Sequence, residues 1–261
     1  MTVFFHELKR NRLAFLIWCG AIAFMLTVCV FIYPEMSSEM EEIGDMFADM
    51  GAFSEAFGMD QLNFGEFMGY FGVECGNTLG IGGALFAAIL GISALAKEQK
   101  DGTAEFLLTH PLSRERIVFE KLLAILSQLL VLDVVVAVCC SLSSLIISAE
   151  VKWPELLLLF LAHLILQIQI ALMTLGLSAF LKGNGLGVGL GRALLLYFLN
   201  ILANLTEQLE FLKFLTPFSY ADGAFIIKEC GIEIRYLLPG LLFALAGAAV
   251  AFIKYRSKDI T

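Results

Sequence analysis

Long apolar stretches separated by shorter polar segments dominate the hydrophobic pattern of this chain. A helix needs about 20 mostly apolar residues to cross the hydrocarbon core of a bilayer, and six stretches meet that length. They span residues 13–33, 71–96, 122–147, 156–181, 186–205 and 236–253. Pro34 directly follows the first stretch and is expected to end its helix. The pattern predicts an all-α membrane protein, one transmembrane domain over residues 1–261 with six transmembrane helices.

Composition supports the same class. Of the 261 residues 59% are hydrophobic and 16% are charged, whereas soluble domains have about 45–50% and about 25%. The first apolar stretch exceeds the core of a signal peptide, so we expect a retained span. These features predict a multi-pass protein of the cell membrane whose immediate partner is the lipid bilayer. The acidic balance argues against nucleic acid as a partner.

The basic residues are distributed unevenly between the polar segments. All of the 17 Lys and Arg residues except Lys152, Lys213, Lys228 and Arg235 fall on the side that holds both ends of the chain. Since short cytoplasmic loops are rich in Lys and Arg, both termini and the loop 97–121 are predicted to be cytoplasmic. The acidic segment 34–70 is then extracellular. Its Met and Phe spacing predicts one or two amphipathic helices, whose role stays open.

Three further segments have weaker patterns. Residues 2–12 fit either a short helix at the membrane interface or a frayed basic end. The mixed segment 206–235 predicts one or two short re-entrant or interfacial helices on the outer side. Two glycine ladders, with glycine at every fourth position, predict close helix packing in lipid. They comprise Gly72, Gly76 and Gly80, and Gly183, Gly187 and Gly191.

Catalytic and metal-binding patterns are absent from the sequence. The three histidines form no His-Glu-x-x-His pair, and no Gly-x-Ser-x-Gly or Gly-x-x-x-x-Gly-Lys-Ser/Thr motif occurs. The chain is therefore predicted to be no enzyme, to have no catalytic residue, and to bind no metal or cofactor of its own. Cys75 and Cys230 share the predicted outer side, and whether they form a disulfide stays open.

Several polar side chains fall inside the predicted spans, where an unpaired charge costs several kcal/mol. One interpretation is a substrate path through the bundle, and the other is ordinary hydrogen bonding between helices. An alternative function uses two of these residues, Asp133 and Glu74, in a stand-alone ion-coupled carrier. The set comprises Glu74, Asp133, His163, Asn200 and Asn204.

The loop 97–121 contains two helix signals. Asp101 or Thr103 can cap a short helix that ends before Pro111, and Ser113 can cap a second helix that continues into the third span. Between them lies an apolar patch, Phe106–Leu108, among charged residues. The patch either tucks under the bundle or docks into a partner.

The loop also carries a family resemblance. The string Lys97-Glu98-x-x-Asp101-Gly102-Thr103-x-Glu105-x-Leu107-Leu108-x-x-Pro111-x-Ser113-Arg114-x-x-Ile117-x-x-x-Lys121 resembles the loop between the second and third spans of ATP-binding-cassette type 2 exporter permeases. Leu215-Thr216-Pro217-Phe218-Ser219-Tyr220 is similar to that family too.

The resemblance implies a permease subunit that forms a homo- or heterodimer with a second permease chain. It also implies two separate ABC ATPase subunits, which hold ATP and Mg and receive a short cytosolic coupling helix in a cleft. Export follows from the resemblance alone, and the substrate stays open between lipophilic small molecules, antimicrobial peptides and ions. A non-transporting membrane scaffold or sensor is a further alternative. The implied coupling residues are Glu98, Asp101, Gly102, Thr103, Glu105, Phe106, Leu107, Leu108, Pro111, Ser113 and Arg114.

Overall fold

The computed structural model describes residues 2–49, 51, 62–63, 65–97, 113–181, 183 and 185–257 of the chain. Side chains of residues 36, 38–49 and 207 are not described. Within these ranges every regular element is a helix. In order they are α1 (Thr2–Asp49), α3 (Phe67–Cys75), η2 (Gly76–Ile81), α4 (Gly82–Ser93), α7 (Arg114–Ile146), α8 (Trp153–Ser178), α9 (Leu186–Leu205), η3 (Glu207–Phe214), η4 (Ser219–Ala221), α10 (Gly223–Glu229) and α11 (Ile234–Arg256).

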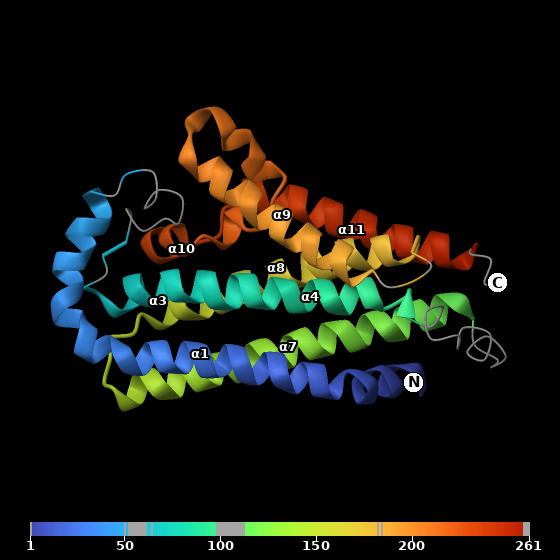
Figure 1. Cartoon of the computed structure of the whole chain (residues 1–261), viewed down its shortest axis with the longest axis horizontal. Helices are drawn as coiled ribbons and strands as arrows, with labels where there is room; N and C mark the ends of the chain where they lie inside the picture. Colours follow the sequence, from blue (N-terminus) through green and yellow to red (C-terminus); the bar gives the residue numbers. More distant parts are fainter. Residues whose placement is uncertain are drawn as a thin grey trace.

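Six helical stretches in the described residues are long and apolar enough to cross a membrane. One of them, Phe67–Ser93, is built from α3, η2 and α4 in direct succession. The predicted all-α class with six membrane-spanning helices is therefore confirmed. The beginning of α1 and the end of α11 lie at the same end of the bundle (Figure 1).

The prediction that Pro34 ends the first helix is wrong. Pro34 lies inside α1, which continues to Asp49 and bends across the end of the bundle (Figure 1). Proline removes one backbone hydrogen bond and tends to bend a helix rather than stop it where neighbouring groups can compensate. The Ser37 hydroxyl donates to the Pro34 carbonyl at 3.1 Å. At the other end of α1, residues 2–12 form its first turns instead of a frayed end.

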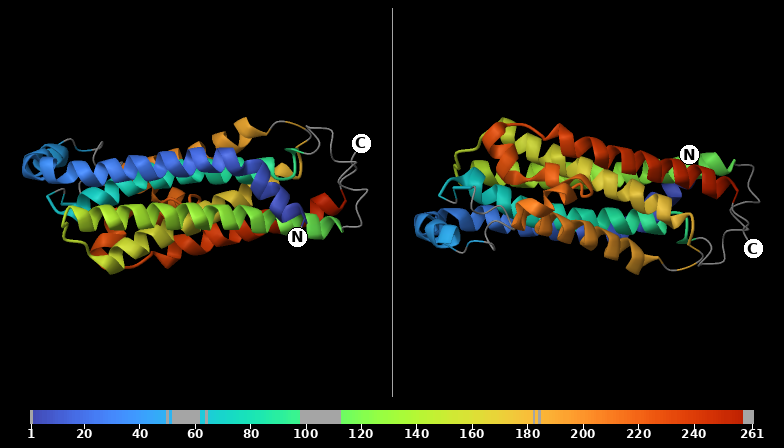
Figure 2. Two further views of the ribbon diagram at one scale, coloured as in Figure 1. Left: turned by 90° about the horizontal axis from the view of Figure 1, so that it is seen from below. Right: turned by 90° about the horizontal axis from the view of Figure 1, so that it is seen from above.

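The bundle is organised around α8, which packs against α4 on one side and α11 on another (Figure 2). α1 packs along α7, and α9 packs against α4. Large apolar side chains on the outer faces of α1, α7, α9 and α11 remain exposed, as lipid-facing helices require. Examples from four helices are Phe24, Leu142, Leu195 and Leu242.

The first predicted glycine ladder packs inside the chain only in part, because Gly72 and Gly80 lie against other side chains whereas Gly76 faces open space. Gly80 lies against His163, where a Cβ would sit 3.3 Å from the ring Nε2. Gly183, Gly187 and Gly191 instead face open space, so the prediction for the second ladder is wrong within the described chain. Gly185 and Gly189 lie two residues away from the ladder positions, which is about 200° of rotation around the helix. They therefore face the other way, towards Ile92 of α4.

The segment between α9 and α11 contains three short helices, η3, η4 and α10, where one or two were expected. α10 packs against α3 and α8, and η4 packs against α8 (Figure 1). η4 and α10 therefore lie against the bundle.

Candidate functional site

Most of the implied coupling residues lie outside the described residues: Glu98, Asp101, Gly102, Thr103, Glu105, Phe106, Leu107, Leu108 and Pro111. The structure does describe the chain on both sides of them. Ser113 has extended backbone, and its hydroxyl accepts a hydrogen bond from the Arg116 N–H at 3.3 Å. It caps α7, as predicted, with Glu115 in the first turn near the positive end of the helix dipole.

Arg114 connects this start of α7 to the end of α11. Its guanidinium donates to the backbone carbonyls of Tyr255 and Arg256, at 3.4 and 3.1 Å. The last carbonyls of a helix have no partner within the helix, so a cation there satisfies them and suits the dipole. Arg256 adds an exposed ion pair to Glu115 at 3.5 Å. The residues directly after position 112 are thus held against α11.

Lys121, about two turns further along α7, forms a buried contact with two other helical segments. Its ammonium lies 2.8 Å from a Glu7 carboxylate oxygen of α1 and donates to the Ala94 carbonyl, just past α4, at 2.7 Å. Lys97, at the start of the loop, donates to Asn11 at 3.3 Å. Both flanks of residues 98–112 are therefore tied to α1.

Glu120 extends this arrangement to the first turn of α1. One carboxylate oxygen accepts from the backbone N–H groups of Val3 and Phe4 at 3.0 and 3.2 Å, and the other pairs with Arg116 at 3.0 Å. Free N–H groups at a helix start favour a carboxylate in this position. We refer to Glu7, Lys97, Arg114, Glu120 and Lys121 together as the loop anchor.

The second resembling motif, Leu215–Tyr220, fastens its segment to the bundle. The Thr216 hydroxyl donates to the Leu196 carbonyl of α9 at 2.7 Å, and the Ser219 hydroxyl donates to Asn200 at 2.9 Å. The buried Tyr220 hydroxyl donates to Gln169 of α8 at 3.0 Å. These hydrogen bonds place the motif across α8 and α9, where it closes one side of a cavity.

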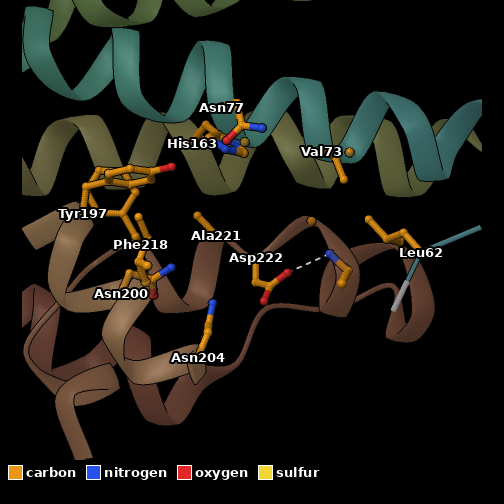
Figure 3. A pocket seen from close by; sticks show the side chains of 15 residues that line it. Leu62, Val73, Asn77, His163, Tyr197, Asn200, Asn204, Phe218, Ala221 and Asp222 are labelled. Carbon is orange, nitrogen blue, oxygen red and sulfur yellow. Dashed lines mark hydrogen bonds between the residues drawn. The ribbon is translucent and has the colours of Figure 1, made fainter. Parts of the chain in front are cut away.

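That cavity has a volume of about 70 Å³ and lies between α3, η2, α8, α9 and the η4–α10 connection (Figure 3). η2 is a π-helix, a widened turn that frequently occurs at functional sites. Asn77 and His163 lie on one wall, facing Asn200, Asn204 and Asp222 on the other (Figure 3). These five polar side chains therefore converge on one space.

Three of the five polar residues predicted for a substrate path line this cavity: His163, Asn200 and Asn204. The other two do not. Glu74 accepts a long hydrogen bond from the Cys29 thiol at 3.5 Å, towards α1. Asp133 is buried in α7, and one of its oxygens has no partner among the described atoms. The structure thus separates Glu74 and Asp133 from the cavity.

Asp222 begins α10 and accepts a hydrogen bond from the Ala224 N–H at 2.8 Å. Loss of water on burial raises the pKa of Asp222, and this effect is opposed by the Ala224 and Phe225 N–H groups and by Lys213. The sequence offered no signal for Asp222, which lies in a loop. Asn77 lies inside the predicted span 71–96, so the rule that selected Asn200 and Asn204 could also have selected it. Tyr197 was detectable, since it precedes Asn200 and Asn204 on one helix face.

The cysteines and the acidic residues form neither a disulfide nor a metal site in the described part of the chain. Cys75 is buried, Cys230 is exposed, and both are free thiols. No group of three or more His, Cys, Asp or Glu side chains among the described residues is arranged to hold a metal ion.

Comparison with known families decides what this bundle is. The family described as "ABC-2 family transporter protein" matches residues 1–252. The chain belongs to the ABC-2 transporter family. No curated protein matches it. Membership makes the chain the membrane-embedded permease subunit of an ABC transporter and implies partnership with an ABC ATPase subunit.

Within this ABC-2 permease, the resembling string and the loop anchor share Lys97, Arg114 and Lys121. Lys97, Ser113, Arg114 and Lys121 all belong to the string, and each makes one of the contacts described above. Ile117 is fully buried in the core of the bundle. The described residues of the string therefore either hold the ends of the loop against the helices or pack in the core.

Proposed function

We propose that this permease is driven by ATP that is hydrolysed, with Mg, on two separate ATPase subunits. It acts as a dimer with a second permease chain, identical or different, and moves its substrate outwards. The sequence supports a separate energy source, because it contains no phosphate-binding Gly-x-x-x-x-Gly-Lys-Ser/Thr motif. The ATPase subunits dock on residues 98–112, and the end of the bundle with both termini faces the cytoplasm, as the Lys and Arg distribution favours.

The observation that carries this proposal is the loop anchor. A docked partner that moves residues 98–112 pulls on both flanks of the segment. Arg114 passes this displacement to α11, while Lys121 passes it to α1 and to the end of α4. Because Lys121 and Glu7 are buried and tightly paired, their helices move with the loop as a unit. A segment with loose flanks would absorb the movement instead.

The cavity between α3, η2, α8 and α9 forms part of the proposed substrate route. Three polar residues predicted for that route line it. Lipophilic small molecules, antimicrobial peptides and ions are the classes to be tested. The acidic residues Glu74 and Asp133 do not line this cavity.

The test is to co-purify the permease with its ATPase and to measure ATP hydrolysis by the reconstituted pair. Charge reversal Glu105→Lys together with Leu107→Asp should release the ATPase or abolish its stimulation by the permease. The matched control, Glu229→Lys with Phe211→Asp, places the same changes on exposed residues of α10 and η3. An intact complex with full stimulation in the loop variant would refute the docking site.

A further inference from the structure

The cavity lined by Asn77, His163 and Asp222 has an unbalanced charge. Asp222 contributes a carboxylate, whereas no Lys or Arg is among the side chains that line it in the described structure. The segment 34–70, which precedes α3 and leads into it, contains no Lys or Arg in its sequence. Lys213, which does not line the cavity, lowers the pKa of Asp222 through its positive charge, and the negative charge of Glu233 raises it. An anionic ligand would therefore meet a carboxylate without a compensating cation in the wall.

The hydrogen-bonding groups of the cavity favour a donor as ligand. His163 is 1% exposed, and its Nδ1 lies 2.8 Å from the Leu159 carbonyl oxygen. Since a carbonyl can only accept, Nδ1 carries the proton, and a neutral ring then presents a lone pair on Nε2. Asn77 makes no side-chain hydrogen bond to the described residues, so its amide oxygen is available as a second acceptor.

The negative charge of the Asp222 carboxylate is only partly compensated by its neighbours. Burial raises the pKa of its carboxyl group despite the two backbone N–H groups that it faces, because the charged form has lost water. A cation seated beside the carboxylate would offset that loss. The adjacent rings of Tyr197 and Phe218, in edge contact with centroids 5.4 Å apart, supply an apolar and cation-tolerant wall.

The volume of the cavity matches a small polar group, and because the cavity is open on one side an attached chain can lead out of it. A single water needs about 10–15 Å³ on this measure, so about 70 Å³ holds an ammonium group with a short part of an attached chain. We propose that the cavity binds the primary ammonium group of an amphiphile, which donates to Asp222, His163 Nε2 and the Asn77 amide oxygen. Its role as a substrate site rests on the proposed transport function, while binding itself does not.

Binding is tested with radiolabelled octylamine on the full-length permease in phosphatidylcholine nanodiscs, with empty nanodiscs as background. Asp222→Asn removes the charge and keeps a side chain that caps α10 equally well. We expect it to weaken octylamine binding about tenfold or more, since a charge-assisted hydrogen bond is lost. Asn77→Ala, remote from that cap, should weaken binding about fivefold. Glu150→Gln, on an exposed residue outside the cavity lining, should leave the affinity unchanged.

Octyl sulfate is the competitor that tests charge selectivity. It should not displace octylamine, whereas unlabelled octylamine should. Equal affinity in wild type and Asp222→Asn, or displacement by octyl sulfate, would overturn the proposal. Because the assay contains no ATPase, failure here leaves the ATP-driven mechanism standing, and failure of ATPase stimulation leaves the ammonium site standing.

The same binding measured in phosphatidylethanolamine nanodiscs distinguishes two sources of the ammonium group. If octylamine binds more weakly in these discs to the wild type but not to Asp222→Asn, the result supports the site and identifies the lipid headgroup as an occupant. Equal binding in both lipids supports the site and identifies a separate amphiphilic amine.

Discussion

Lys121 and Glu7 form a buried ion pair that joins α7 to α1 at the base of the loop 98–112. Nitrogen and oxygen are 2.8 Å apart, and the two side chains are 1% and 8% exposed. Lys121 gains a further partner in the Ala94 carbonyl, so its charge is satisfied by two helical segments distant in sequence. The pair defines how the first three spans meet at this end of the bundle.

Removing one partner of this pair should be far more damaging than removing both. Lys121→Met leaves Glu7 buried without its cation, which costs about 3–5 kcal/mol, whereas Lys121→Met with Glu7→Leu leaves no unpaired charge. Unfolding free energies in mixed micelles measure both variants. A single variant as stable as the double variant would contradict the pairing.

Arg114 should determine how tightly the end of α11 is held. Arg114→Gln removes two charge-assisted hydrogen bonds to α11 carbonyls, one of them long, and should cost about 1–2 kcal/mol locally. Hydrogen exchange at residues 253–256 should become faster. Arg12→Gln, on an exposed position of α1, serves as the control. Unchanged exchange in the Arg114 variant would show that α11 does not depend on this contact.

Two tyrosines of the cavity region allow a matched comparison. The buried Tyr220 hydroxyl donates to Gln169 of α8, so Tyr220→Phe leaves a buried acceptor without its donor. We expect a loss of about 1–2 kcal/mol in unfolding free energy. Tyr197 makes no hydroxyl hydrogen bond to the described residues, and Tyr197→Phe should change stability by less than about 0.5 kcal/mol. Equal effects would mean that the Tyr220 contact contributes nothing.

Glycines on packed and open helix faces should respond in opposite directions. A Cβ at Gly247 of α11 would lie 2.6 Å from the Leu172 carbonyl oxygen of α8, so Gly247→Ala should destabilise by about 1–3 kcal/mol. Gly187 of α9 faces open space, and Gly187→Ala should stabilise the helix by up to about 1 kcal/mol. Thermal unfolding of each purified permease measures the difference. A destabilising Gly187→Ala would place a second surface against α9.

Local patterns in the sequence were sufficient for the helices and for parts of their ends. Ser113 was predicted to cap α7 because hydroxyl residues favour that position, and it does. The prediction for Pro34 was also based on a local preference, because proline disfavours a helix interior. It was wrong, since α1 continues through Pro34. The second glycine ladder failed because spacing alone does not say which face of α9 meets another helix.

The candidate site was only partly predictable. His163, Asn200 and Asn204 were identified because polar side chains inside apolar spans are costly and therefore conspicuous. Asp222 was missed because it lies in a mixed segment without a strong pattern, whereas Asn77 lies inside the predicted span 71–96 and could have been selected by the same rule. The same rule also selected Glu74 and Asp133, which lie apart from the cavity.

The sequence by itself determined the class of the protein, the six apolar helices and the loop string that supplies Lys97, Arg114 and Lys121 to the anchor, because hydrophobic length and capping depend on neighbours along the chain. Only the tertiary structure decided that Lys121 pairs with Glu7, more than a hundred residues away, and that Asp222 faces His163 across a cavity. Such pairings depend on how helices are rotated and stacked, and those rotations are fixed by packing between elements that are far apart in sequence.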